Sequence, residues 1–286
     1  MADRVGLGWR PEIAAALMRH LDAVDLVEVI AENFMDRRGA AALRTLVSEV
    51  PVVLHGVSLG LASALPVDER RLARLARLAE ATRLPVWSEH LAFVRAGGRE
   101  IGHLAAPPRT AETIAGTLRN VERATALVGS APALENIATL IDPPASTLDE
   151  CAWISAIAEG AGATLLLDLH NLYANALNFG ADPLALLAAL PLERVRMVHL
   201  SGGVWIGGGN GERERLLDDH LHDVPAPVYG LLEMLAARAP QPLDVIIERD
   251  GRFPPIEDLL AEVRAARAAL ARGRARAAVA EERLAA

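Results

Sequence analysis

The strongest constraint on the fold is an alternation of short apolar runs with longer segments of helical periodicity along nearly the whole chain. The apolar character of each run is continuous, which is typical of parallel strands buried on both faces. An eightfold strand–helix alternation predicts an α/β fold, the (β/α)8 TIM barrel, with a doubly wound open sheet as the alternative. The expected strands are Val5–Gly8, Leu26–Ala31, Val52–Gly56, Val86–His90, Ala133–Asn136, Thr164–Asp168, Val195–Leu200 and Asp244–Glu248. The expected helices include Pro11–His20, Glu69–Thr82, Thr110–Val128, Leu148–Gly160 and Pro183–Ala189.

The length of 286 residues suits one barrel, which typically needs roughly 250. We find no linker and predict a single domain, with the barrel at residues 1–270 and a C-terminal helical tail at residues 271–286. The charges of the tail alternate in sign, which favours a solvated face over a nucleic-acid arm. Hydrophobic residues make up 52% of the chain and aromatic residues only 3%, so the expected core is aliphatic.

Charge and cysteine content exclude several classes of protein. A formal net charge of −8 argues against a broad nucleic-acid surface. The single cysteine, Cys151, excludes an internal disulfide and a cysteine-based zinc site, and we expect a buried thiol without a special role. No uncharged apolar run reaches the ~18 residues of a membrane span, and the N-terminus does not resemble a signal peptide. These features predict a soluble cytoplasmic protein.

Polar residues gather where the expected strands end. The third to eighth strands each deliver an ionisable residue at the C-terminal end, which is the face where barrel enzymes carry their active sites. A single histidine there is more often structural, and a single carboxylate can cap the next helix. Several carboxylates converging on one barrel face, however, would resist ionisation unless cations compensated them. Imidazole and carboxylate are ligands of zinc, iron and manganese, so the pattern predicts a metal centre.

Two segments after the seventh strand add to this picture. Gly202–Gly211 lacks the ending of a phosphate-binding loop, and it is either a flap over the site or a plain surface loop. Asp218 and His220 form an Asp-x-His pair that can bind one ion where the backbone is extended. The alternative is a polar turn before Pro225.

These residues together resemble the DUF692 family, the multinuclear non-haem iron-dependent oxidative enzymes. The resemblance runs from about Val5 to Asp250 and includes the stretches GLGWRPE, LHGVSLGL, WSEHLAF, ENI, LDLHNLYANALNFG, VHLSGG and DDHLHDVPAPV. The family shares its scaffold with the barrels that resemble endonuclease IV and xylose isomerase. The metal ligands implied by the resemblance are His55, His90, Glu135, Asp168, Asn171, His199, Asp218, His220 and Glu248.

The resemblance also implies how these ligands are shared. His55, His90 and Glu135 would hold one ion, and Glu135 would bridge to a second. Asp168, His199 and Glu248 would complete the second site. Asn171, Asp218 and His220 would bind a third, weaker ion. An asparagine at position 171, in place of a histidine, resembles the iron family more than the DNA-repair enzymes.

The implied activity is oxidation of cysteine residues in a ribosomally synthesised precursor peptide. It would use dioxygen and two or three iron ions of mixed Fe(II)/Fe(III) valence, which zinc or manganese could replace during purification. Glu89 and Asp250 are candidates for proton transfer, and Arg10, Glu32 and Arg249 for peptide contact; salt bridges at strand ends would explain these five residues equally well. A separate peptide-recognition partner protein is also implied, and no nucleic acid or membrane.

Two segments depart from the family pattern, so the identity of the peptide is not carried over. Trp205–Asn210 is unusually rich in glycine, and Gly102–Pro107 lacks the acidic, Leu-Pro-containing character of the best-known members. Three alternative functions stay open. They are a zinc- or manganese-dependent phosphodiesterase resembling endonuclease IV, a sugar isomerase or epimerase, and a non-catalytic metal-storage or scaffold protein.

Overall fold

Eight parallel strands form a closed barrel in the order β1-β12-β9-β8-β7-β4-β3-β2, which confirms the predicted (β/α)8 fold. The computed structural model describes residues 2–96, 98–208 and 213–285. Each strand coincides with an expected apolar run to within one residue at either end. The barrel strands are β1 (Arg4–Trp9), β2 (Val27–Ile30), β3 (Val52–Gly56), β4 (Trp87–His90), β7 (Ala133–Glu135), β8 (Leu165–Asp168), β9 (Val195–Leu200) and β12 (Asp244–Ile247).

Nine α-helices occur among the residues that the structure describes, and the five expected helices are among them. The helices are α1 (Pro11–Leu17), α2 (Arg37–Glu49), α3 (Glu69–Thr82), α4 (Ala111–Val128), α5 (Glu150–Ala161), α6 (Leu169–Phe179), α7 (Pro183–Ala189), α8 (Ala226–Arg238) and α9 (Ile256–Ala285). Short 3-10 helices lie at Leu21–Ala23, Ala31–Phe34 and Leu192–Arg194. None of the described helices combines the length and apolarity needed to span a membrane.

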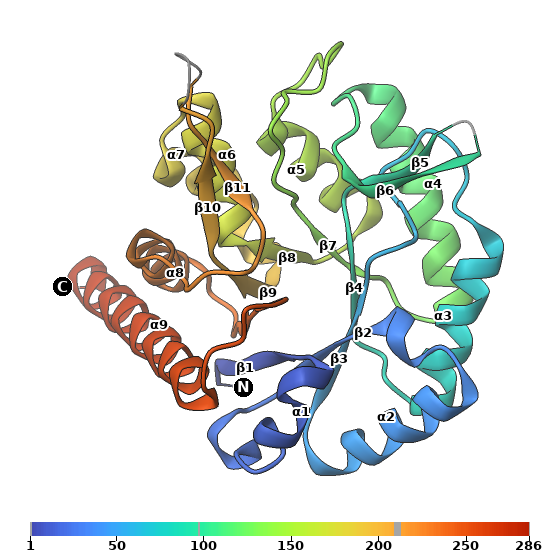
Figure 1. Cartoon of the computed structure of the whole chain (residues 1–286). Helices are drawn as coiled ribbons and strands as arrows, with labels where there is room; N and C mark the ends of the chain where they lie inside the picture. The colour runs from blue at the N-terminus through green and yellow to red at the C-terminus, as the bar shows by residue number, and fades with distance from the viewer. Residues whose placement is uncertain (1, 97, 209–212, 286) are drawn as a thin grey trace. The chain divides into compact units, whose positions relative to one another are not determined.

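The chain divides into two compact units, residues 27–166 and residues 1–26 together with 167–286. In the first unit β2, β3, β4, β7 and β8 pair in parallel. Outside these strands α3 and α4 run side by side (Figure 1). Helix α3 begins where the Asp68 side chain accepts from the amides of Arg70 and Arg71, and it buries Leu72, Leu75 and Leu78 on one face.

In the second unit β12 pairs in parallel with β1 and with β9. Helices α8 and α9 pack along each other (Figure 1). Gly273 makes this packing possible, because a Cβ atom there would lie 2.3 Å from the carbonyl oxygen of Glu233. Helix α9 continues through the expected domain boundary at residue 270. Beyond that boundary, Arg274 donates to the Asp3 carboxylate and to the Gln241 carbonyl.

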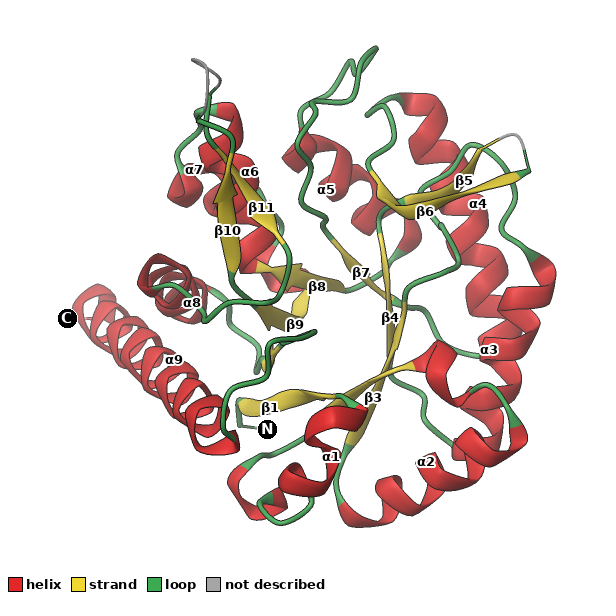
Figure 2. Ribbon diagram, in the orientation of Figure 1, coloured by secondary structure: helices red, strands yellow, loops and turns green. Residues whose placement is uncertain are grey.

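Two antiparallel hairpins interrupt the strand–helix alternation, and the sequence did not predict them (Figure 2). Strands β5 (Phe93–Ala96) and β6 (Arg99–Ala105) lie between β4 and α4, and β10 (Gly203–Ile206) and β11 (Arg215–Asp218) lie between β9 and α8. The segment expected as a flap or surface loop, Gly202–Gly211, therefore contains a strand. Its residues 209–211 lie outside the described part of the chain.

Candidate metal centre

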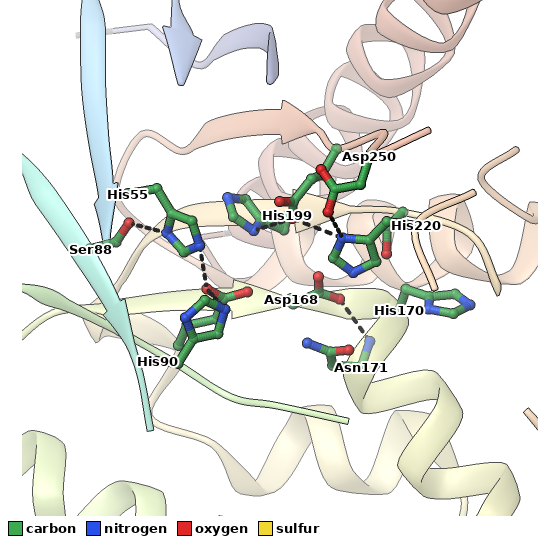
Figure 3. A network of polar contacts seen from close by, with 12 residues as sticks. His55, Ser88, His90, Asp168, His170, Asn171, His199, His220 and Asp250 are labelled. Carbon is green, nitrogen blue, oxygen red and sulfur yellow. Dashed lines mark hydrogen bonds and ion pairs between the residues drawn. The ribbon is translucent and has the colours of Figure 1, made fainter. Parts of the chain in front are cut away.

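The first cluster of ligand atoms lies within the unit of residues 27–166. His55 on β3, His90 at the end of β4 and Glu135 at the end of β7 are buried, and their ligand atoms all lie within 4.8 Å of one another. Oε2 of Glu135 lies 3.6 Å from Nε2 of His55 and 3.3 Å from Nε2 of His90. The two rings lie next to each other, with centroids 4.7 Å apart (Figure 3). The register of the strands brings His90 and Glu135 together, because these two residues pair across β4 and β7.

Two residues of β4 hold the histidines of this cluster. Oγ of Ser88 lies 2.8 Å from Nδ1 of His55, so the other ring nitrogen of His55 faces Glu135. Glu89 is fully buried and accepts from the amides of Leu59 and His90, each at 3.0 Å. Oε1 of Glu89 also lies 3.4 Å from Nδ1 of His90. The structure therefore places Glu89, a predicted proton-transfer residue, where it orients His90 and the loop after β3.

Two imidazoles and one carboxylate form a donor set that fits a metal ion. Nε2 of each histidine faces the same oxygen of Glu135, so three ligand atoms converge from one side. This set is the one used by non-haem iron enzymes and by several zinc enzymes, and it leaves coordination positions open. Ser88 and Glu89 would serve as the outer partners that fix the orientation of metal-bound histidines.

The second group of ligand atoms lies in the unit of residues 1–26 and 167–286. Atoms of Asp168, His199 and Glu248 lie within 4.8 Å of one another, and so do atoms of His220, Glu248 and Asp250. Oε2 of Glu248 lies 3.1 Å from Nδ1 of His199 and 3.3 Å from Nδ1 of His220. Glu248 thus belongs to both sets, and it offers one carboxylate to two imidazoles.

Asp218 and Asn171 lie beside these sets. Nε2 of His220 lies 2.8 Å from Oδ2 of Asp218, which brings the expected Asp-x-His pair together. His220 has a positive φ of 54°, so its backbone is left-handed, not extended as the pair was expected to require. The Asn171 backbone amide donates to Asp168 at 2.7 Å, and Asp168 thereby caps α6 (Figure 3). Asp168 therefore offers an oxygen to the cluster while it begins a helix.

The charged residues predicted for catalysis and peptide contact take part in ion pairs. Arg10 is buried, and it donates to Glu248 at 2.9 Å and to Asp250 at 2.7 Å. Asp250 is the most exposed carboxylate of its cluster, with 39% of its side chain accessible. Arg249 donates to the carbonyl of Leu221 and pairs with Asp223, so it fixes the segment that carries His220.

Glu32 lies in the other unit, in the 3-10 helix after β2, where it accepts from the amide of Val57 at 3.1 Å. The amide and the carboxylate both belong to segments that follow a barrel strand, β3 and β2 respectively. Glu32 therefore ties together two segments at the C-terminal ends of neighbouring strands. Its expected contact with a peptide stays a prediction.

The electrostatics of the second group centre on His220. Burial on its own would lower the pKa of His220, but the charges of Glu248 and Asp218 hold it well above its ordinary value. Burial on its own would raise the pKa of Asp218, yet His220 and a hydrogen bond from His170 lower it to about 2. Glu248 follows the same rule, since burial opposes ionisation while His220 and His199 hold its pKa well below the usual range. The carboxylates are thus ionised and suited to a cation.

Sequence reasoning missed two residues that support the ligands. Ser88 directly precedes the predicted residues Glu89 and His90 on β4, and His170 lies between Asp168 and Asn171. Both are buried. Both residues are close in sequence to predicted ligands, and this proximity was the signal that could have identified them. Which way each side chain points depends on the strand register and on where α6 begins.

Comparison with known proteins decides the family. A family model described as "RiPP precursor modification enzyme MbnB/TglH/ChrH" matches residues 4–271. The chain belongs to this family. The match confirms the resemblance to DUF692-type proteins, and membership in MbnB/TglH/ChrH implies an enzyme that acts on RiPP precursors, the ribosomally synthesised peptides that are modified after translation.

Proteins similar to this chain include several named UPF0276 protein. One from Streptomyces avermitilis is 41% identical over 95% of this chain, which spans 56% of that relative's length. One from Anaeromyxobacter sp. is 37% identical over 91% of this chain and 90% of its own. One from Caulobacter vibrioides is 37% identical over 95% of this chain and 96% of its own.

Solved structures with the same fold include those of an epimerase and of a xylose isomerase domain protein. An L-ribulose 3-epimerase has a TM-score of 0.60 and 17% identity, and the match covers 100% of this chain and 99% of the epimerase. A xylose isomerase domain protein from Planctomyces limnophilus has a TM-score of 0.62 and 17% identity, with coverage of 97% and 99%. At such identities the likeness shows the fold alone, so it does not carry the reaction over.

Proposed function

We propose that the protein is a multinuclear non-haem iron enzyme that uses dioxygen to oxidise cysteine residues of a ribosomally synthesised precursor peptide. The observation that carries the proposal is the buried set of two histidines and one carboxylate formed by His55, His90 and Glu135. Membership in a family of precursor-modifying enzymes supports a peptide substrate. Iron as the metal, dioxygen as the oxidant and cysteine as the target residue are parts of the proposal.

His55, His90 and Glu135 would hold one iron ion, and Asp168, His199 and Glu248 another. Asn171, Asp218 and His220 would serve a third, weaker position. When bound, iron supplies redox chemistry with dioxygen and lowers the pKa of a bound thiol. The predicted bridging role of Glu135 stays a prediction.

The chain's own residues would organise the ligands and the protons. Ser88 would fix the His55 ring through a contact of 2.8 Å to Nδ1, and Oε1 of Glu89, 3.4 Å from Nδ1 of His90, would help to orient the second ring, so that both Nε2 atoms are directed at Glu135. Asp250 is the carboxylate suited to receive the proton that a cysteine thiol releases, because it is the most exposed of its cluster. Arg10 holds Oδ1 of Asp250 at 2.7 Å, so Oδ2, which lies 3.4 Å from Nδ1 of His220, would be the accepting atom.

The partners remain part of the proposal. The substrate is a cysteine-containing precursor peptide, a separate partner protein helps to recognise it, and the reaction takes place in the cytoplasm. Arg10, Glu32 and Arg249 remain candidates for peptide contact. Their hydrogen bonds within the fold also give each of them a structural role.

The first experiment is elemental analysis of anaerobically purified protein together with Mössbauer spectroscopy of iron-57-enriched material. Two or three irons per chain with coupled mixed-valence signals would support the proposal. Dioxygen uptake with cysteine peptides, compared with the same peptides carrying serine, then tests the reaction. Zinc or manganese that persists when iron is abundant, with no thiol-dependent uptake, would contradict the proposal and favour a phosphodiesterase or a sugar isomerase.

A further inference from the structure

His170 is a fully buried histidine that lies beside a predicted metal ligand but was not itself predicted to have a role. It occupies the first turn of α6, and its Nδ1 atom lies 2.6 Å from Oδ1 of Asp218. An ionised carboxylate can only accept hydrogen bonds, so Nδ1 of His170 carries the hydrogen and donates it. Ser201 adds a second donor to the same oxygen at 3.3 Å.

The hairpin β10–β11 locks the His170 ring in this position. A Cβ atom at Gly203 would lie 2.7 Å from Cε1 of His170 and 2.2 Å from the carbonyl oxygen of Leu217. Gly203 pairs with Asp218 across the hairpin, so the element that covers the ring also carries its partner. The ring and the carboxylate are therefore fixed relative to each other by backbone packing.

The contacts of the two ring nitrogens indicate the role of His170. Its other nitrogen, Nε2, is buried and has no hydrogen-bond partner among the described residues. An apolar ring would fill the same space without burying an unsatisfied polar atom, whose desolvation is unfavourable. The hydrogen bond that Nδ1 donates to Asp218 therefore accounts for the presence of a histidine at this position.

Both oxygens of Asp218 are engaged, but by different partners. His170 and Ser201 hold Oδ1, whereas Oδ2 lies 2.8 Å from Nε2 of His220. Ligands must lose their protons to bind a metal ion. The two atoms of this contact, Oδ2 of Asp218 and Nε2 of His220, are the atoms that would hold an ion here.

We propose that His170 is a positioning residue for the metal position served by Asp218 and His220. By holding one oxygen of Asp218, it keeps the other oxygen directed at His220 and so sets the affinity of that ion. The inference rests on the proposed function, because it requires a multinuclear metal centre. His170 would act on the ion indirectly, because it contacts the candidate ligand Asp218 and not the ion.

The test compares two substitutions at position 170 with a matched control. His170→Phe keeps a ring but removes the donor, and His170→Asn keeps a donor close to the place of Nδ1. His222→Phe removes a comparable contact from the same segment, since Nδ1 of His222 lies 2.9 Å from Oδ1 of Asp219. The whole metal-free protein is titrated with Fe(II) in equilibrium dialysis and with Co(II) followed by its visible absorption, and circular dichroism checks each fold.

We expect His170→Phe to weaken one ion by about 10–100-fold, the usual effect of losing an outer partner, and to leave the other ions at wild-type affinity. His170→Asn should retain most of the affinity of that ion, and His222→Phe all of it. The inference is overturned if His170→Phe binds every ion normally, weakens all ions alike, or behaves the same as His170→Asn. Wild-type protein that binds no metal would instead overturn the proposed function, and this inference with it.

Discussion

The contact between α8 and α9 offers a direct test of how a glycine shapes the second unit. Gly273 lies on α9, where a Cβ atom would meet the carbonyl oxygen of Glu233 at 2.3 Å, Cβ of Ala236 at 2.6 Å and the amide nitrogen of Ala237 at 3.1 Å. Two of these atoms belong to the α8 backbone, which cannot turn aside as a side chain can. Gly273→Ala must therefore push the two helices apart.

Gly230 provides the matched control because it lies on α8, is exposed, and has no described atom within 4 Å of the place that a Cβ atom would take. Replacing glycine by alanine inside a helix stabilises the helix by about 1 kcal/mol, and both variants share this gain. The difference between the variants therefore isolates the cost of overpacking, about 1–3 kcal/mol. For a domain of this size the difference separates the melting temperatures by roughly 2–12 °C.

Differential scanning calorimetry, with urea unfolding followed by circular dichroism, measures both variants against the parent protein. Gly230→Ala should melt at a higher temperature than the parent, and Gly273→Ala should melt well below Gly230→Ala. Equal increases in melting temperature for the two variants would refute the close approach of α9 to Glu233 and Ala236.

Three further predictions concern the candidate site and the single cysteine. His199→Ala should lower metal content and activity together, because its Nδ1 atom lies 3.1 Å from Glu248, and unchanged metal stoichiometry would remove His199 from the ligand set. Burial raises the pKa of Cys151 from 9.0 to about 11, so at pH 8 the native thiol should react with iodoacetamide about 100-fold more slowly than in the urea-unfolded chain; equal rates would show that the thiol is accessible. Gly56→Ala would bring a Cβ atom to 2.9 Å from Oε2 of Glu89 and should destabilise the fold by about 1–3 kcal/mol and weaken metal binding, as seen by urea unfolding and Fe(II) titration, whereas the exposed Gly230→Ala should leave metal binding unchanged.

The barrel strands could be predicted because each one is buried along most of its length. Every residue of β3 and β8 is buried, so the apolar run in the sequence and the strand in the structure have nearly the same bounds. The candidate ligands His55, His90 and Glu135 follow from the same rule, since a polar residue at the end of such a run lies at the C-terminal face of the barrel.

The hairpins could not be predicted because they bury little apolar surface. The residues of β6 are exposed or half-buried, and β10 contains no buried residue, so neither strand has a hydrophobic pattern that indicates its conformation. The contact between His170 and Asp218 depends on such a hairpin, because Asp218 is the last residue of β11. Adjacent positions in the sequence thus indicated the neighbourhood of His170 but not its partner.

The left-handed backbone of His220 explains how the side chains of the Asp-x-His pair meet without an extended chain. In an extended segment Asp218 and His220 would project on the same side, as residues two apart do in a strand. Here β11 ends at Asp218, and the chain turns at His220 with a φ of 54°. The turn brings Nε2 of His220 to 2.8 Å from Oδ2 of Asp218 and Nδ1 to 3.3 Å from Oε2 of Glu248. One imidazole thereby joins the carboxylate of the hairpin to the carboxylate that follows β12. The position of the hairpin and the geometry of the cluster are therefore coupled through His220, and Arg249 strengthens that coupling by binding the carbonyl of Leu221, the next residue.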